Sequence, residues 1–192
     1  LTFVTNTVDD KKRILSTLLE IALIDPAYKN KLEEFYNANN ATTKKFGTYW
    51  MEAINASANI APSSSLYMLN RKLFSSKQLS GKWILVDFWG TWCGPCREEH
   101  PDLQKFCDSI VVTKLENISL LTIACRDTEE KVLNYLHEKQ LTFPVAMSDN
   151  RIEHAYAVQG YPAKMLITPE GKNITIPFGI DWLNFVKQYC DL

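Results

Sequence analysis

Two cysteines separated by two residues are the strongest chemical signal in the sequence. Cys93 and Cys96 follow a nearly continuous apolar run, Trp83–Trp89, and stand at the start of a segment with helical spacing. A helix N-terminus carries unsatisfied N–H groups and a partial positive charge, so a thiolate placed there has a pKa lowered from about 8.5 towards 7. Gly94 and Pro95 suit the first turn of such a helix. The pattern predicts a dithiol in which Cys93 attacks a substrate disulfide and Cys96 resolves the mixed disulfide.

The same spacing is also found in zinc sites and in structural disulfides. A zinc site needs two further ligands, usually a second closely spaced pair, and a bridge across so short a loop stabilises a fold little. The other cysteines and histidines are scattered along the chain, at Cys107, Cys125, Cys190, His100, His137 and His154. Thiol–disulfide exchange is therefore the favoured interpretation, with no metal and no cofactor beyond the redox-active pair itself. Zinc binding and structural pairing remain as alternatives.

Length and composition exclude several classes of protein. The chain has 192 residues, of which 46% are hydrophobic and 22% charged, as in ordinary soluble globular domains. Its 21 Lys and Arg residues nearly balance its 22 Asp and Glu residues, so we expect no nucleic-acid partner, which would require a clustered basic surplus. No apolar stretch approaches the ~20 residues that span a bilayer. Five cysteines leave at least one outside any internal disulfide.

The first residues do not resemble a secretory leader. Leu1–Asp10 has neither a basic start nor a long apolar core. We therefore expect a mature, trimmed or partial chain, for which a signal segment or membrane anchor would lie outside the given sequence.

The chain divides at a turn-rich cluster, Ala-Pro-Ser-Ser-Ser at residues 61–65. Residues 1–60 show the apolar spacing of helices, and Asp25-Pro26 is typical of a helix start. After this cluster, expected strands alternate with expected helices, which predicts an α/β sheet covered on both sides. The expected strands are 66–69, 83–89, 119–124, 143–147, 165–168 and 174–178, and the expected helices are 93–110, 128–139, 150–156 and 181–190. We predict a helical N-terminal extension over 1–60, either an appendage packed on the main domain or a partner-binding module, and one domain over 61–192.

Three short segments carry a resemblance to a known family. The stretch from Val86 to Cys96, VDFWGTWCGPC, resembles the active-site strand and turn of the thioredoxin superfamily. Pro101 matches the kink of that family's active-site helix, and Tyr161-Pro162 falls where the family has its cis-proline. The resemblance covers about residues 62–192. It implies a thioredoxin-like fold, with a central mixed β-sheet flanked by helices.

Two further features resemble one branch of the superfamily, the TlpA/ResA group of extracytoplasmic thiol–disulfide oxidoreductases. An extra helix and strand separate Cys125 from Pro162, and Glu99 matches the group's characteristic active-site glutamate. This resemblance implies an exported or membrane-anchored protein of the periplasm or cell envelope. It implies protein disulfides as substrates and a membrane or soluble thiol as electron donor. The helical extension is similar to that of TlpA-like proteins of Bacteroidetes.

Asp87 and Glu99 are candidate catalytic carboxylates. Asp87 interrupts an apolar strand, and a buried carboxylate needs either a partner or a raised pKa. It is either an ion-pair partner of a lysine such as Lys82 or, as the resemblance implies, the acceptor of the Cys96 proton. Glu99 lies three residues after Cys96, so it is either a solvated helix residue or a second carboxylate that tunes the thiols. Which carboxylate accepts the proton stays open.

The resemblance also implies a substrate-binding surface. It makes the Tyr161-Pro162 bond cis and sets the Tyr161 backbone beside the disulfide, where an extended substrate strand would pair. Trp92 would form a wall of the site, next to the Gly94-Pro95 turn. The residues after the proline, Ala163 and Lys164, depart from the threonine often found there. Outside this surface, Cys107, Cys125 and Cys190 are expected to be structural, and His100 to lie exposed on its helix.

Three functions are compatible with these features. The first is a thiol–disulfide oxidoreductase that reduces protein disulfides, because the Gly-Pro dipeptide equals that of thioredoxin, which the resemblance associates with a reducing pair. The second is a partner-binding module of an export or respiratory-maturation system, in which the thiol pair is a redox-regulated latch. The third and weakest is a peroxidase, which requires a peroxidatic cysteine in a tuned site.

Overall fold

The computed structural model describes residues 7–39, 44–63, 65–75, 81–113 and 115–190. The chain forms two compact units, one of Asn59–Ile180 and one of Leu1–Ala58 together with Asp181–Leu192. The larger unit is a mixed α/β fold, which confirms the predicted fold class. The smaller unit is helical and includes the last helix, which the sequence prediction placed in the α/β domain.

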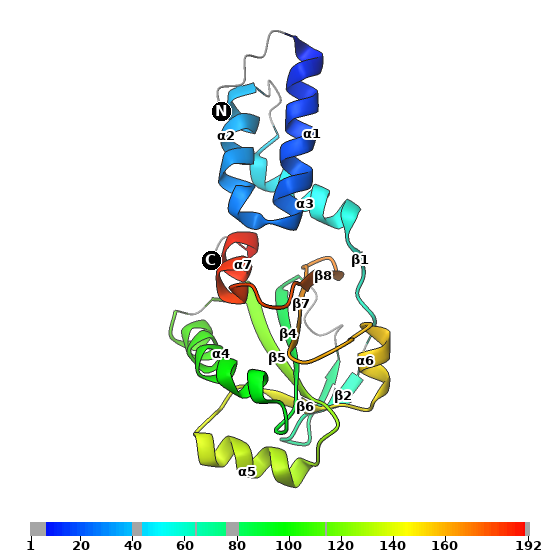
Figure 1. The fold of residues 1–192 in the computed structure, drawn as a ribbon, viewed down its shortest axis with the longest axis vertical. Coiled ribbons are helices and arrows are strands. Elements are labelled where there is room, and N and C mark those ends of the chain that lie inside the picture. The colour runs from blue at the N-terminus through cyan, green and yellow to red at the C-terminus, as the bar shows by residue number, and fades with distance from the viewer. Residues whose placement is uncertain (1–6, 40–43, 64, 76–80, 114, 191–192) are drawn as a thin grey trace. The chain divides into compact units, whose positions relative to one another are not determined.

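The larger unit is built on a six-stranded mixed sheet (Figure 1), with strands in the order β1-β8-β7-β4-β5-β6. Two pairs of strands are parallel, β4 with β5 and β5 with β6. Three pairs are antiparallel: β4 with β7, β7 with β8, and β8 with β1. A separate hairpin joins β2 and β3. The strands are β1 (Asn59–Ile60), β2 (Ser65–Tyr67), β3 (Leu73–Ser75), β4 (Trp83–Trp89), β5 (Ile118–Ala124), β6 (Val145–Met147), β7 (Ala163–Ile167) and β8 (Lys172–Ile176).

Strand β4 is the central strand because its sequence, WILVDFW, supplies apolar side chains to both faces. All seven of its residues are buried. Ile84, Val86 and Phe88 point into one core layer, which α6 (Arg151–Ala155) and the following Tyr156 cover. The alternate residues, Asp87 among them, face the opposite side, where the active-site helix packs.

That active-site helix is α4 (Gly94–Val112), which begins immediately after β4. Cys93 is its N-cap residue and Pro95 lies in its first turn, in agreement with the sequence prediction. Leu103 and Phe106 are buried on its inner face. Helix α5 (Glu129–Lys139) begins at the cap residue Thr128 and contributes Tyr135 to the same side of the sheet.

The helical unit consists of α1 (Val8–Ile24), the 3₁₀ turn η1 (Pro26–Tyr28), α2 (Lys29–Asn39), α3 (Phe46–Ser57) and α7 (Trp182–Cys190). Hydrogen bonds tie α7 to the N-terminal helices. The Tyr189 hydroxyl donates to the Leu23 carbonyl at 2.7 Å, and the Lys29 ammonium donates to the Gln188 carbonyl at 2.9 Å. These partners are about 160 residues apart in sequence, so no local pattern could have assigned α7 to this unit.

His100 anchors α4 to the sheet, which corrects the prediction that it lies exposed. The residue is 1% exposed, and its ring packs edge-on against Trp89 with 4.5 Å between ring centroids. Nδ1 lies 2.8 Å from the hydroxyl of Tyr135, while Nε2 is buried without a hydrogen-bond partner among the described residues. Burial, helped by the nearby Lys164 and Arg97 charges, lowers the pKa of His100 to about 4. The folded protein therefore holds this imidazole neutral at pH 7.

This burial makes stability depend on pH in a defined direction. Because the folded-state pKa is depressed, the contribution of His100 is complete above the ordinary value of 6.5 and is lost as the pH falls towards about 4. We expect the difference in unfolding free energy between the wild type and His100→Gln to fall by about 3 kcal/mol between pH 7 and about pH 4. Urea denaturation of both proteins across that range measures it.

The matched control is His137→Gln, which changes an exposed histidine on α5. Its difference from the wild type is expected to stay constant over the same range. A His100→Gln difference that also stays constant with pH would contradict the buried, neutral imidazole.

Candidate active site

A disulfide joins Cys93 and Cys96 at the N-terminus of α4, with 5.3 Å between their Cα atoms. Cys93 Sγ accepts a hydrogen bond from the backbone N–H of Cys96 at 3.2 Å. This is the helix-cap position that the sequence predicted for the nucleophilic thiol, where free N–H groups favour negative charge on sulfur. Both cysteines are buried in this oxidised form, at 5% and 1% exposure respectively.

The turn before Cys93 is fixed on both of its sides. The Thr91 N–H donates to the Asp127 carboxylate at 2.6 Å, and the Cys93 N–H donates to the Gly90 carbonyl at 3.0 Å. A side chain at Gly90 would meet the Trp92 indole at 2.4 Å and the Cys125 carbonyl at 3.0 Å. Only glycine fits between them, which explains this residue in the sequence at the end of β4.

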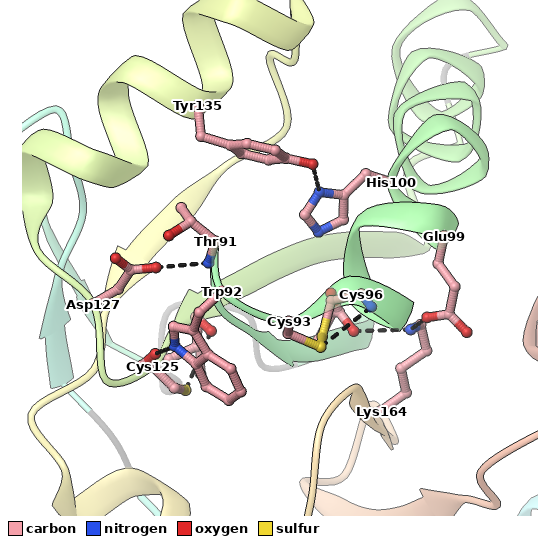
Figure 2. Close-up of a disulfide and its surroundings, with 12 residues drawn as sticks. Thr91, Trp92, Cys93, Cys96, Glu99, His100, Cys125, Asp127, Tyr135 and Lys164 are labelled. Atoms are coloured by element: carbon pink, nitrogen blue, oxygen red, sulfur yellow. Dashed lines mark hydrogen bonds and ion pairs between the residues drawn. A yellow bond between two sulfur atoms is a disulfide. The ribbon is translucent and has the colours of Figure 1, made fainter.

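The Trp92 side chain lies close to the disulfide (Figure 2). Its indole N–H donates to the Cys125 carbonyl at 3.1 Å, yet half of the residue remains exposed beside the disulfide. The Tyr161 ring meets the indole edge-on, with ring centroids 5.2 Å apart. The Tyr161–Pro162 peptide bond is cis, as expected, and leads directly into β7.

Asp87 and Glu99 share a single buried cation, Lys164. The Lys164 ammonium lies 2.9 Å from Asp87 Oδ1 and forms a second, shorter contact with Glu99 Oε2. Asp87 and Lys164 are directly opposite each other in the β4–β7 pair, so their side chains share the face on which α4 lies. Figure 2 shows Lys164 extended towards Glu99 on α4, beneath the turn that holds Cys96. The lysine that pairs with Asp87 is thus Lys164, and not Lys82, which is exposed.

The charges in this triad are set by burial and by one another. Burial raises the pKa of Asp87, and the Lys164 charge offsets only part of that rise. Burial alone would lower the pKa of Lys164, but the two carboxylates outweigh it and raise the pKa instead. Lys164 therefore stays cationic, and Asp87 is the carboxyl group whose proton affinity is increased.

Sequence reasoning missed Lys164 as a site residue, although the signal was present. Lys164 stands immediately before an apolar run, Met165-Leu166-Ile167, just as Asp87 interrupts the apolar run of β4. Two opposite charges in two buried strands indicate an ion pair if the strands are neighbours. That β4 and β7 are neighbouring strands is a property of the tertiary structure, and the sequence pattern alone does not show it.

The remaining predicted residues occupy less central positions. Gly94 and Pro95 are the first two residues of α4; Gly94 is half-buried and Pro95 is exposed. Cys125 and Cys190 are buried, and Cys107 is half-buried on α4. The described residues contain no group of three or more His, Cys, Asp or Glu side chains placed to hold a metal ion. None of the described helices has the length and apolar character needed to cross a membrane.

Comparison with known proteins places this geometry in a family. The model of the AhpC/TSA family matches residues 58–174. The chain is 29% identical over 133 residues to the thiol-disulfide oxidoreductase ResA of Bacillus subtilis, covering 69% of this chain and 73% of that protein. It is 30% identical over 132 residues to the thioredoxin-like protein YneN of the same organism, covering 69% of this chain and 77% of that protein.

Solved structures agree with this assignment. The thioredoxin domain of a thiol-disulfide oxidoreductase from Bacteroides vulgatus has a TM-score of 0.60 and 25% identity, covering 69% of this chain and 96% of that domain. A thiol:disulfide interchange protein of the thioredoxin family from Chlorobium tepidum has a TM-score of 0.61 and 26% identity, covering 70% and 95%. The chain therefore belongs to the AhpC/TSA family and is a thioredoxin-like thiol–disulfide oxidoreductase of the ResA type.

Proposed function

We propose that this oxidoreductase reduces protein disulfides, with Cys93 as nucleophile and Cys96 as resolving thiol, in an extracytoplasmic compartment. The observation that carries the proposal is the position of Cys93 at the N-cap of α4, bonded to the more buried Cys96. A thiolate at that cap is stabilised by the helix and lies next to the exposed wall formed by Trp92.

The reaction is a two-electron exchange in two steps. The Cys93 thiolate attacks one sulfur of the substrate disulfide, whose S–S bond breaks, and the leaving sulfur departs as a thiolate that takes up a proton. Cys96 then loses its proton, and its thiolate attacks Cys93 Sγ in the mixed disulfide. The bond to the substrate breaks, the second substrate thiol is released, and the protein is left as the Cys93–Cys96 disulfide.

Asp87 is the acceptor of the Cys96 proton in this proposal, directly or through one water molecule. Its pKa is raised by burial, which makes it a stronger base than an ordinary aspartate. The positive charge of Lys164 compensates the negative charges of both carboxylates. Glu99 tunes the thiol pair because it competes with Asp87 for the Lys164 ammonium.

The substrate lies across Trp92, the Gly94-Pro95 turn and the Tyr161-Pro162 loop. An extended chain pairs there with the backbone of the loop, while its cysteine reaches Cys93. The chemistry uses no cofactor beyond the dithiol. A membrane or soluble thiol donor returns the disulfide to the dithiol, and the similarity to the thiol-disulfide oxidoreductase ResA supports the exchange chemistry itself.

The assignment of the two thiols is tested by single substitutions. We expect Cys93→Ser to abolish insulin reduction, because no nucleophile remains, and Cys96→Ala to accumulate a mixed disulfide on Cys93 that mass spectrometry detects. Cys107→Ser changes a free cysteine elsewhere on α4 and serves as the matched control, with activity unchanged. Insulin reduction that survives Cys93→Ser would contradict the assignment.

The direction of electron flow is tested by the reduction potential of the Cys93–Cys96 couple. A reductase requires a value near that of thioredoxin, about −270 mV, whereas a value near −120 mV, roughly that of a strong oxidant, would reverse the proposed direction. Equilibration with glutathione of known redox state, followed by mass spectrometry, gives this potential.

The role of the triad predicts a pH effect of known sign. Asp87→Asn removes the proton acceptor, so we expect resolution of the mixed disulfide to slow by roughly tenfold or more in single-turnover experiments. Lys164→Met removes the cation that partly offsets the raised pKa of Asp87. That pKa then rises further, and the rate of resolution should reach its plateau at a higher pH than in the wild type.

Lys172→Met is the control for Lys164→Met, because it removes a half-buried lysine at the start of the neighbouring strand β8. Its pH profile is expected to match the wild type. Asp87→Asn rates equal to those of the wild type across about pH 6 to pH 9 would overturn the role of Asp87 as proton acceptor.

A further inference from the structure

A second buried carboxylate, Glu153, lies behind the cis-proline loop, and neither the exchange chemistry nor the triad uses it. Glu153 belongs to α6 and is 8% exposed. No ion pair to it occurs among the described residues, whereas buried carboxylates ordinarily have a cation or several hydrogen-bond donors. Two hydroxyl groups meet this need. The Ser148 hydroxyl donates to Oε2, and the Tyr161 hydroxyl donates to Oε1 at 3.1 Å.

Tyr161 is held from three directions. Besides its hydrogen bond to Glu153, its ring meets the Trp92 indole edge-on, and the Arg126 guanidinium lies over it at 5.6 Å from the ring centroid. The thiol of Cys125 also belongs to this cluster. Burial, reinforced by the Glu153 charge, raises the pKa of that thiol, so it stays protonated and unreactive.

The same cluster reaches the active-site turn. The indole N–H of Trp92 donates to the carbonyl of Cys125, and the Trp92 ring abuts Tyr161. Glu153, Tyr161 and Trp92 thus form a continuous chain of contacts from α6 to the turn that carries Cys93. Its middle member, Tyr161, lies 69 residues after Trp92 in the sequence.

A groove continues from this chain of contacts along the cis-proline loop. It has a volume of about 360 Å³, and Pro162, Met165, Pro177 and Phe178 are among the residues that line it. Phe178 is 76% exposed at its rim. A small disulfide needs only the two sulfur atoms of the site, but a protein substrate must also lie along this loop and groove. The position of the Tyr161 side chain therefore affects the binding of protein substrates but not of small disulfides.

We propose that Glu153 is a positioning residue that locks Tyr161 against Trp92 and so makes the site selective for disulfides in extended protein segments over small disulfides. This inference rests on the proposed reductase function and adds the specificity of the same site. Glu153 does not touch the substrate. It acts by fixing the wall and the loop against which a protein segment binds, so that this surface is ordered before the substrate arrives.

The test compares Glu153→Leu, which removes both acceptor oxygens, with Glu153→Gln, which keeps the shape and one acceptor oxygen. For Glu153→Leu we expect the KM for insulin to rise about fivefold, since part of a hydrogen bond to a charged acceptor is lost from the bound wall. The KM and kcat for oxidised glutathione should stay within about twofold of the wild type. Glu153→Gln should lie between the wild type and Glu153→Leu.

The matched control is Tyr156→Phe, which removes a buried hydroxyl that donates to the Pro62 carbonyl at 3.3 Å and not to Glu153. It is expected to change stability without changing the ratio of the two KM values. A merely structural role for Glu153 would give this same behaviour. An equal loss of activity on insulin and on glutathione disulfide in Glu153→Leu would also overturn the proposed selectivity.

Amide hydrogen exchange tests the clamp without any catalytic assay. In Glu153→Gln and Glu153→Leu, exchange should accelerate in peptides that cover residues 91–93 and 159–163, and not only in α6. Acceleration confined to α6 would contradict the clamp even in an active enzyme. A wild type that reduces neither insulin nor glutathione disulfide would refute the reductase function instead, and the exchange result would still decide whether Glu153 holds the loop. Ser148→Ala provides a milder variant should Glu153→Leu fail to fold.

Discussion

The larger unit depends on one buried ion pair, between Asp87 in the central strand and Lys164 in the strand beside it. A carboxylate in the middle of a fully buried strand is costly unless a cation and further hydrogen bonds compensate it. The antiparallel register of β4 and β7 places Lys164 directly opposite Asp87. A slip of one residue would turn Lys164 to the other face of the sheet and leave Asp87 unpaired. The ion pair therefore requires one particular register of β7, and this register also sets the position of the cis-proline loop that precedes the strand.

The third member of the triad connects this pair to the thiols. Glu99 reaches Lys164 from α4, one helical turn beyond Cys96, while His100 fills the aromatic cluster of Trp89 and Tyr135 on the same side of the sheet. The helix is thus held at neighbouring positions by the ionic contact of Glu99 and the aromatic contacts of His100. These contacts also fix the position of its N-terminus, where Cys93 is the cap residue. The sheet register and the packing of α4 therefore share one set of contacts.

Local patterns were sufficient for the parts of the molecule whose cause is local. The apolar run of β4, the CxxC pair at the helix start and the proline in the first helical turn all appear in the structure where the sequence predicted them. The residues that reasoning missed depend on partners far away in sequence. Lys164 is defined by its cross-strand position, and His100 was expected to be exposed because its aromatic partners come from other elements. The assignment of α7 to the helical unit likewise rests on contacts with helices near the N-terminus.

We propose that the fold makes the two thiols chemically different: the N-terminus of α4 activates Cys93, whereas Cys96 keeps its proton next to the Asp87–Lys164–Glu99 triad. An NMR titration of the reduced protein, labelled with ¹³C at the cysteine Cβ atoms, measures both thiols separately. We predict that Cys93 has a pKa well below the ordinary value of about 8.5 and that Cys96 titrates at higher pH than Cys93. Two thiols that titrate together near that ordinary value would contradict this chemical difference between Cys93 and Cys96.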